Sequence, residues 1–405
     1  MRAQRIVERC RLLATFSETA GHLRRTFLSP PMRGVHRLLR EWMEAAGMQV
    51  WIDAAGNLRG VYPAAQDPAP RLLLGSHLDT VPDAGAFDGV LGVVLAIELV
   101  DSLADRRLPF AIEVAAFSDE EGVRFGVPFL GSRALTGALD AALLARCDPA
   151  GVSLEEAIRA FGLDPQRLPE ARLDERAFAY LEFHIEQGPE LDSLHLPLAV
   201  VTSIAGQSRA TVTFRGEARH AGTTPMPLRR DALAGAARWI AFVEHHARRT
   251  PGLVATVGAL QVSPGAANVV SGEVRASLDV RHPDNSARRC ALQTLRAAAD
   301  RIAASRGLTA EWRLHADAPS TPCDAALTGS LARAVETAGF PVHRMPSGAG
   351  HDAMILAQCL PIAMLFLRSP GGISHHPAET VHAADVEAAL SAGAAFLAEL
   401  ERAHA

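Results

Sequence analysis

Histidine and carboxylate residues stand at the ends of short apolar segments at five places along the chain. These places are Gly75–Thr80, Phe87–Gly89, Asp119–Glu121, Phe183–Glu186 and Ser374–Pro377. Neutral imidazoles and carboxylates are ligands that suit zinc, manganese or cobalt, and the lack of neighbouring cysteines disfavours a closed structural zinc site. A single histidine after a strand is more often a hydrogen-bonded structural residue. Five such segments together predict a catalytic metal centre.

Two adjacent glutamates, Glu120 and Glu121, follow shortly after the apolar segment Phe110–Phe117. Neighbouring side chains leave an extended strand on opposite sides, so one glutamate can bind metal while the other handles protons. Taken alone, the pair is about as well explained by a solvated acidic turn. The apolar segment before it and Gly122 after it favour the functional interpretation.

The elements that must hold these residues alternate between helices and short apolar strands in the first half of the chain. A helix is predicted over 36–46, and buried strands are predicted over 72–74 and 110–117. This alternation is typical of an α/β fold with a mostly parallel sheet covered by helices. Ligands bind at the carboxyl ends of such strands, which is where His77 and Asp79 stand.

The segment 207–317 has a different pattern. Strands are predicted over 209–218, 253–262, 273–281 and 311–315, and helices over 229–249 and 285–306. The order βαββαβ is that of a compact ferredoxin-like α+β unit. The earlier pattern then returns, with a helix over 325–338, a strand over 362–367 and a helix from 384. We therefore expect a discontinuous metal-binding catalytic domain, 1–206 with 318–405, and an inserted lid or dimerisation domain over 207–317.

The composition argues against several classes of partner. The 405 residues carry a formal net charge of -5 without a long basic run, so nucleic acid is not expected. The longest apolar stretch, 89–100, contains Glu98 and is shorter than the roughly 20 residues that span a bilayer. The N-terminal segment is charged throughout, and the five cysteines are far apart. We predict a cytoplasmic protein with no membrane partner.

Seven longer motifs connect the chain to a known family. They are GSHLDTV, FDGVLGV, SDEEGVRF, LEFHIEQGP, HAGTTPM, PGAANVV and GGISHHPAE. With these motifs the sequence resembles the zinc-dependent aminoacylase and carboxypeptidase superfamily. Within it, the chain is most similar to the N-carbamoyl-L-amino-acid hydrolases and allantoate amidohydrolases, the hydantoinase/carbamoylase amidases. The resemblance runs from about Arg25 to the C-terminal helix, which is nearly the whole chain.

The resemblance implies a role for each candidate ligand. Asp88 would bridge two divalent metal ions, which would be zinc or else manganese or cobalt. His77 and His184 would complete the first metal position. Glu121 and His375 would complete the second.

Three further residues near these ligands also have implied roles. Glu120 would be the general base, which accepts a proton from the attacking water and later protonates the departing nitrogen. Asp79 would fix the tautomer of the His77 imidazole. His376 stands where relatives often carry asparagine, so the sequence leaves open whether His375 or His376 is the ligand.

The resemblance also implies residues that bind the substrate. His220 would stabilise the negative charge of the tetrahedral intermediate, acting from the other subunit of a homodimer formed through the inserted domain. Arg281 and Asn268 match positions that hold the substrate carboxylate, which a guanidinium can grip through two parallel hydrogen bonds. Gln187 and Arg209 match further positions near the substrate. Without the resemblance, such residues are more often partners in surface salt bridges or loop hydrogen bonds.

These implications predict a dinuclear-metal amidohydrolase of a small carboxylate-bearing substrate. It would cleave the carbamoyl (ureido) C–N bond of allantoate or an N-carbamoyl-L-amino acid, with release of ammonia and carbon dioxide. One alternative is an N-acyl amino acid or peptide hydrolase of the same superfamily, although many peptidase relatives carry a carboxylate where this chain has His184. Another is a non-catalytic binding protein, which the retention of Glu120 and all five ligands disfavours. His351, in a glycine-rich loop, is left without a role.

Overall fold

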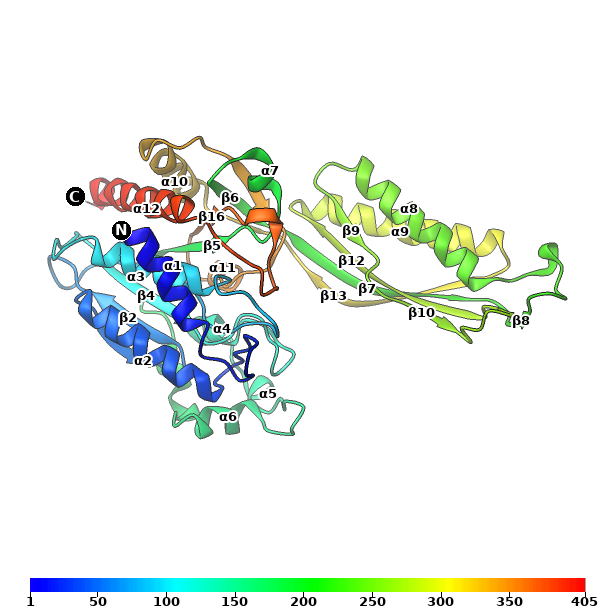
Figure 1. The fold of residues 1–405 in the computed structure, drawn as a ribbon, viewed down its shortest axis with the longest axis horizontal. Coiled ribbons are helices and arrows are strands. Elements are labelled where there is room, and N and C mark those ends of the chain that lie inside the picture. The colour runs from blue at the N-terminus through cyan, green and yellow to red at the C-terminus, as the bar shows by residue number, and fades with distance from the viewer. Residues whose placement is uncertain (405) are drawn as a thin grey trace. The chain divides into compact units, whose positions relative to one another are not determined.

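The computed structural model describes residues 1–404 and consists of two compact units, each with its own hydrophobic core. The first unit comprises Met1–Thr202 and the segment from Cys323 onward, and the second comprises Ser203–Pro322. The second unit therefore begins four residues before and ends five residues after the insertion predicted over 207–317. Figure 1 traces both units along the chain.

A nine-stranded sheet lies at the centre of the first unit, and only its edge strand β14 and the last two residues of β6 fall within Ser203–Pro322. Its strands are β1 (Gln49–Ile52), β2 (Leu58–Tyr62), β3 (Arg71–His77), β4 (Ala111–Phe117), β5 (Ala177–Ile185), β6 (Leu198–Ile204), β14 (Thr321–Pro322), β15 (Arg344–Ser347) and β16 (Ile362–Leu367). Their order across the sheet is β1-β2-β4-β3-β5-β16-β6-β14, and β15 pairs with β6.

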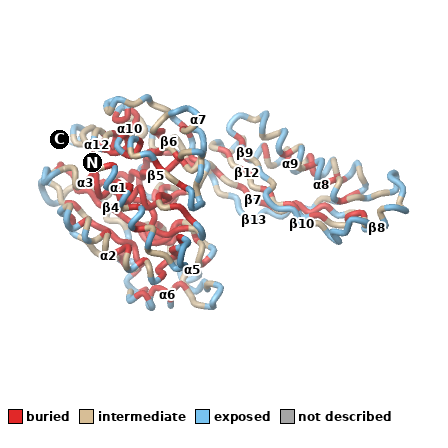
Figure 2. The backbone as a smooth tube through the Cα atoms, viewed as in Figure 1, coloured by how far each residue is buried: buried red, intermediate tan, exposed pale blue. Residues whose placement is uncertain are grey.

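The central strands of this sheet run parallel, as the sequence predicted. β4, β3, β5 and β16 are paired in parallel, whereas β2 and β6 run antiparallel to them on either side. Every residue of β4 and β16 is buried, which explains why these strands are continuous apolar runs without alternation. Within the first unit, Figure 2 shows buried backbone gathered around β4 and β5.

Helices cover this sheet. They are α1 (Arg2–Leu13), α2 (Pro30–Ala45), α3 (Val90–Asp101), α4 (Leu130–Thr136), α5 (Ala141–Leu144), α6 (Leu154–Ala160), α7 (Glu190–Leu194), α10 (Ala325–Thr337), α11 (Ala353–Leu356) and α12 (Ala383–His404), with short 3₁₀ turns at Pro165–Ala171 and Pro370–Gly372. α3 is buried on all sides because it packs against β3, β5, α1 and α12. Its buried Glu98 is ion-paired with Arg2, Arg5 and Arg9 of α1, which offsets the cost of burying a carboxylate.

The second unit has the βαββαβ order that the sequence predicted. It contains β7 (Gly206–Arg215), β8 (Arg219–His220), α8 (Ala232–Arg249), β9 (Val254–Thr256), β10 (Leu260–Ser263), β11 (Val269–Val270), β12 (Glu273–His282), α9 (Asn285–Ser305) and β13 (Thr309–Ala318), with a 3₁₀ turn at Met226–Leu228. Its main sheet has the order β10-β12-β7-β13, with β9 paired to β12, and β8 pairs separately with β11.

Apolar side chains at every second position of β7 form part of the core of this unit. Ala210, Val212 and Phe214 are buried in a core to which Trp239 of α8 and Leu295 of α9 contribute. The residues between them point to the opposite face of the sheet. The prediction of a single strand over 253–262 is wrong. This segment forms two strands, β9 and β10, which pair with different parts of β12.

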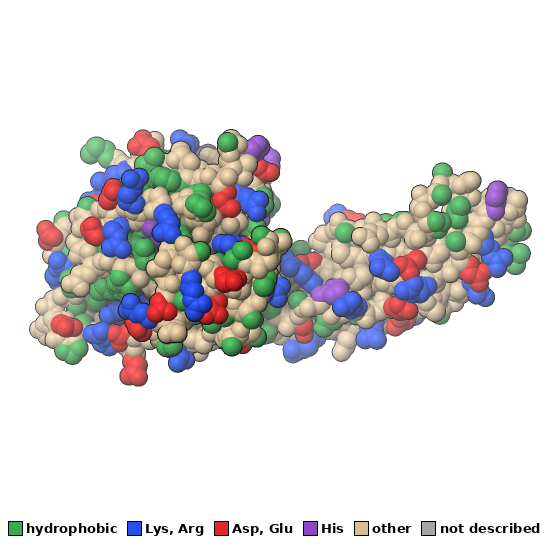
Figure 3. Space-filling model, turned by 90° about the horizontal axis from the view of Figure 1, so that it is seen from below, with side chains coloured by type: hydrophobic (Ala, Val, Ile, Leu, Met, Phe, Trp, Pro, Cys, Tyr) green, Lys and Arg blue, Asp and Glu red, His purple; other side chains and the backbone are tan. Residues whose placement is uncertain are grey.

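The surface carries both signs of charge. On the face shown in Figure 3, Arg side chains are interspersed with Asp and Glu, and all the basic side chains are arginines because the sequence has no lysine. Among residues 1–404, no helix is both long enough and apolar enough to cross a lipid bilayer.

Candidate metal centre

The parallel strands of the first unit deliver the candidate ligands to one edge of the sheet. His77 is the last residue of β3, and His184 stands one residue before the end of β5. The Glu120–Glu121 pair follows β4, and the loop that carries His375 follows β16. Because parallel strands end at the same edge, side chains from distant parts of the sequence converge there.

The first group consists of His77, Asp88 and His184, all of which are buried. Nε2 of His184 lies 3.3 Å from Oδ1 of Asp88 and 3.4 Å from Nε2 of His77. Nδ1 of His77 faces the main-chain oxygen of Asp79 at 3.0 Å, and Nδ1 of His184 faces that of Ile185 at 2.9 Å. A carbonyl oxygen only accepts hydrogen bonds, so each Nδ1 carries a proton and each Nε2 is directed at the shared carboxylate.

The electrostatic surroundings of the two histidines differ. Burial alone would lower the pKa of His77, but the nearby carboxylates of Asp79, Glu120 and Asp88 raise it well above its ordinary value. Burial lowers the pKa of His184 to about 4, so this imidazole is neutral at pH 7. Two convergent ring nitrogens beside a carboxylate, in a field that attracts a cation, fit a bound divalent metal ion.

The second group consists of Asp88, Glu121 and His375. Nε2 of His375 lies 3.0 Å from Oδ2 of Asp88 and 3.3 Å from Oε1 of Glu121. The two carboxylate oxygens of Asp88 thus face different groups. The hydrogen bond to Asp88 and the one to Glu121 raise the pKa of His375 to about 10. His376 is exposed, and its Nδ1 accepts a hydrogen bond from the Ala378 main chain, so of the two histidines it is His375 that lies in the group.

The side chain of Asp79 holds the turn that carries both glutamates. Its Oδ1 accepts the main-chain N–H of Glu120 at 2.8 Å, and its Oδ2 accepts that of Glu121 at 3.1 Å. Nδ1 of His77 is closer to the main-chain oxygen of Asp79, at 3.0 Å, than to the carboxylate, at 3.4 Å. Asp79 therefore orients His77 chiefly through its main chain, while its side chain fixes the two glutamates.

Glu120 has the environment of a proton-transfer group. It is 8% exposed, and its carboxylate accepts no hydrogen bond within residues 1–404. Burial raises its pKa well above the ordinary value, and the charges of Glu121, Asp352 and Asp79 add to the increase against the opposing effect of His77. A raised carboxyl pKa brings this group closer to the working range of a general acid and base at neutral pH.

Gln187 contacts both groups from a strained backbone position. Its φ is 60°, and its Nε2 donates to Oδ1 and Oδ2 of Asp88 at 3.2 and 3.1 Å. Its buried Oε1 has no hydrogen-bond partner within residues 1–404. Strained positions and unsatisfied polar atoms occur preferentially at functional sites.

The remaining predicted substrate residues lie in the second unit and form two separate sets. Asp279 of β12 pairs with Arg281 and Arg209, at 2.9 and 3.0 Å from their Nε atoms. His220 pairs with Val269, so it lies beside Asn268, and both residues are exposed.

The register of β12 separates the two sets. Arg281 pairs with Val254 of β9, whereas Glu273, eight residues earlier, lies at the end nearest β11. Eight residues of strand span about 26 Å. Accordingly, β9 and β8 lie at opposite ends of this unit in Figure 1. Within one chain, His220 and Arg281 do not meet.

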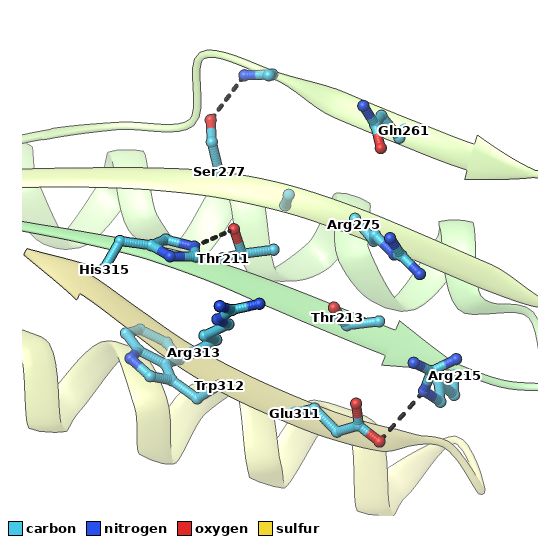
Figure 4. Close-up of a pocket in the computed structure, with 12 residues that line it drawn as sticks. Thr211, Thr213, Arg215, Gln261, Arg275, Ser277, Glu311, Trp312, Arg313 and His315 are labelled. Atoms are coloured by element: carbon cyan, nitrogen blue, oxygen red, sulfur yellow. Dashed lines mark hydrogen bonds and ion pairs between the residues drawn. The ribbon is translucent and has the colours of Figure 1, made fainter. Parts of the chain in front are cut away.

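A depression of about 560 Å³ lies elsewhere, on the open face of the second unit's sheet. Thr211, Arg215, Arg275 and His315 are among its lining residues (Figure 4). None of the predicted site residues lines it. His315 is bonded to Thr211, and Arg215 is ion-paired with Glu311, so this polar hollow is distinct from the candidate metal centre.

Two residues near the centre were missed as contributors by sequence reasoning. His351 is buried, packs its ring edge-on to His184 with centroids 4.6 Å apart, and is bonded to the Ser347 hydroxyl at 2.7 Å. Glu379 accepts hydrogen bonds from the Phe87–Asp88 main chain. The glycine-rich loop before His351 and the GGISHHPAE motif, which ends at Glu379, were the available signals.

Comparisons with known proteins identify the family. The model of peptidase family M20/M25/M40 matches residues 73–400. The chain is 38% identical to allantoate deiminase 1 of Glycine max, over 96% of this chain and 87% of that protein. It is 42% identical to the N-carbamoyl-L-amino acid amidohydrolase of Geobacillus stearothermophilus, over 89% of each.

A solved structure supports the same assignment across the fold. An amidase of the hydantoinase/carbamoylase family from Burkholderia multivorans superposes with a TM-score of 0.92 at 33% identity, covering 98% of this chain and 97% of that one. The resemblance noted in the sequence motifs is thereby confirmed. The chain belongs to peptidase family M20/M25/M40 and is similar throughout its length to the hydantoinase/carbamoylase amidases.

Proposed function

We propose that this chain is an amidohydrolase that cleaves the carbamoyl C–N bond of a small ureido carboxylate at a dinuclear metal centre. The observation that carries the proposal is that Asp88 is shared by two groups of potential ligands, with Glu120 beside them. Relatives named allantoate deiminase and N-carbamoyl-L-amino acid amidohydrolase support this class of substrate. Allantoate and N-carbamoyl-L-amino acids are the two candidate substrates.

The ligand assignment follows from the two groups. His77 and His184 would hold one ion, Glu121 and His375 the other, and Asp88 would bridge them. Imidazole and carboxylate ligands accept zinc, manganese or cobalt. Two divalent ions held there would lower the pKa of bound water and polarise the carbamoyl carbonyl.

Glu120 would move the protons of the reaction. A carboxylate oxygen of Glu120 accepts a proton from the attacking water, and the same glutamate returns it to the departing nitrogen. The products are ammonia and a carbamate, which loses carbon dioxide to leave the amine. The side chain of Asp79 keeps the base in place because it binds the main chain of Glu120.

The substrate carboxylate and the reacting carbonyl would be held by the second unit. Arg281 and Arg209 present guanidinium groups that suit a carboxylate. His220 and Asn268 lie at the separate β8–β11 pair, at the opposite end of the unit from Arg281, so they would reach the substrate of a neighbouring chain. This separation supports a homodimer in which the second unit serves as lid and dimerisation domain, with His220 completing its partner's site.

A test of the function is the release of ammonia from a panel of substrates. Purified protein is incubated with allantoate, N-carbamoyl-L-amino acids, N-acetyl amino acids and dipeptides, with and without a chelator. We expect ammonia from ureido substrates only, loss of activity with the chelator, and recovery on addition of zinc, manganese or cobalt. Cleavage of the N-acetyl or peptide substrates alone would favour the alternative hydrolase. Binding without any turnover would favour a non-catalytic protein.

A further inference from the structure

Two loops that are far apart in the sequence supply ligands to the second group. Asp88 lies just before α3, and His375 lies in the loop between β16 and α12. Neither belongs to a strand or helix that would fix its position. The distance of 3.0 Å between Oδ2 of Asp88 and Nε2 of His375 therefore depends on what joins the two loops.

Glu379 joins them through its carboxylate. The side chain is buried, and its Oε1 accepts the main-chain N–H groups of Phe87 at 2.8 Å and Asp88 at 3.0 Å. Its Oε2 lies 3.1 Å from the hydroxyl of Ser374, the residue before His375. The same hydroxyl lies 3.3 Å from Oδ2 of Asp88. One carboxylate thus binds the main chain of one loop and a side chain of the other.

Gly85 of the loop that carries Asp88 packs closely against Glu379. A Cβ atom placed on Gly85 would lie 2.2 Å from Cβ of Glu379 and 2.5 Å from its Oε1. Real Cβ atoms essentially never approach so closely, so the 85–88 loop requires glycine at this point. The close approach brings the main chain of Phe87 and Asp88 within reach of the short glutamate side chain.

We propose that Glu379 is a positioning residue that fixes Asp88 relative to His375 and thereby sets the affinity of the second metal position, formed by Asp88, Glu121 and His375. This inference rests on the proposed dinuclear centre. Residues that orient metal ligands through hydrogen bonds commonly change metal affinity 10–100-fold when they are replaced. Because His375 belongs to the second position alone, the loss should be larger there than at the position formed by His77 and His184.

The test measures metal binding to metal-free protein rather than activity. Wild type and the variants Glu379→Ala, Glu379→Gln and Ser374→Ala are titrated with Mn²⁺ and Zn²⁺ by calorimetry, and bound metal is counted by mass spectrometry. His184→Ala and His375→Ala show which binding step belongs to which position. Asp53→Ala is the matched control, because Asp53 is also buried and binds the main chain of Ala55 and Asn57 but contacts no proposed ligand.

We expect Glu379→Ala to weaken the second binding step by about 10–100-fold, with a smaller change in the first. Glu379→Gln should stay within about threefold of wild type, because its amide oxygen still accepts both main-chain hydrogen bonds. Ser374→Ala should weaken the second step less than Glu379→Ala. It also provides the same test if Glu379→Ala does not fold.

Three results would overturn the inference while leaving the dinuclear centre in place. The first is that Glu379→Ala still binds two ions with unchanged affinities. The second is that Glu379→Ala and Glu379→Gln weaken the second binding step equally. The third is that the control Asp53→Ala weakens it as much as Glu379→Ala does. Equal losses of affinity in Glu379→Ala and Glu379→Gln would mean that the charge of Glu379, rather than the position that it gives Asp88, sets the metal affinity. By contrast, wild-type protein that binds fewer than two ions would refute the proposed centre itself.

Discussion

Replacement of Glu120 by glutamine tests whether proton transfer and metal binding are carried by different residues. Since Glu120 is 8% exposed and its carboxylate accepts no hydrogen bond within residues 1–404, an amide of the same shape breaks no existing hydrogen bond. The neutral side chain loses the attraction to His77, but it also removes the cost of burial and the repulsion from Glu121, Asp352 and Asp79, which together raise the pKa of Glu120. We therefore expect the folded protein to be at least as stable as wild type.

The expected effect on the reaction is large. A positioned general base contributes about 10²–10⁴-fold to the rate, which corresponds to about 3–5 kcal/mol in the activation free energy. Steady-state ammonia release should show this loss in kcat, while metal counted by mass spectrometry stays at the wild-type value.

The adjacent residue provides a matched control. Glu121 lies 3.3 Å from His375, so Glu121→Gln should lose bound metal together with activity. Turnover in Glu120→Gln within tenfold of wild type would refute the assignment of the base. Loss of metal in Glu120→Gln but not in Glu121→Gln would show that the two roles are reversed.

Three further experiments test the rest of the proposed site. His375→Ala should lower bound metal by one ion per chain, whereas His376→Ala should not; equal metal counts would contradict the choice of His375. Arg281→Lys should raise KM about tenfold by removing paired hydrogen bonds to the carboxylate, and an unchanged KM would exclude that contact. His220→Ala and Glu120→Gln should each be inactive, but mixed dimers of the two, assembled at random, should recover about a quarter of wild-type activity. No recovery in verified mixed dimers would mean that His220 does not act across subunits.

The sequence predicted the first unit well because its signals are local. The strand predicted over 362–367 coincides with β16, since a buried central strand is a continuous apolar run. Parallel strands end at one edge, so ligand-type residues placed directly after apolar runs converge without any knowledge of tertiary structure. For this reason, the residues proposed as ligands were accessible from motifs and strand ends.

Contacts between distant segments left no such signal. Glu379 meets the Phe87–Asp88 main chain across 291 residues of sequence, and a glutamate in a loop is most often exposed. The division of the predicted strand 253–262 into β9 and β10 was equally hidden, because it depends on how each part pairs with β12. Likewise, the separation of His220 from Arg281 depends on strand register, which side-chain alternation does not reveal.

The different environments of Glu120 and Glu121 suit identical neighbours to the different functions proposed for them. Asp79 binds both main-chain N–H groups, so the two side chains leave a common, fixed turn. The side chain of Glu121 reaches Nε2 of His375, and the carboxylate of Glu120 stays buried and accepts no hydrogen bond within residues 1–404. In the proposed site, the distinction between ligand and base would therefore arise from the direction of each side chain rather than from residue type. A change at Asp79 would displace both glutamates together, so only substitutions of the glutamates themselves can separate metal binding from proton transfer.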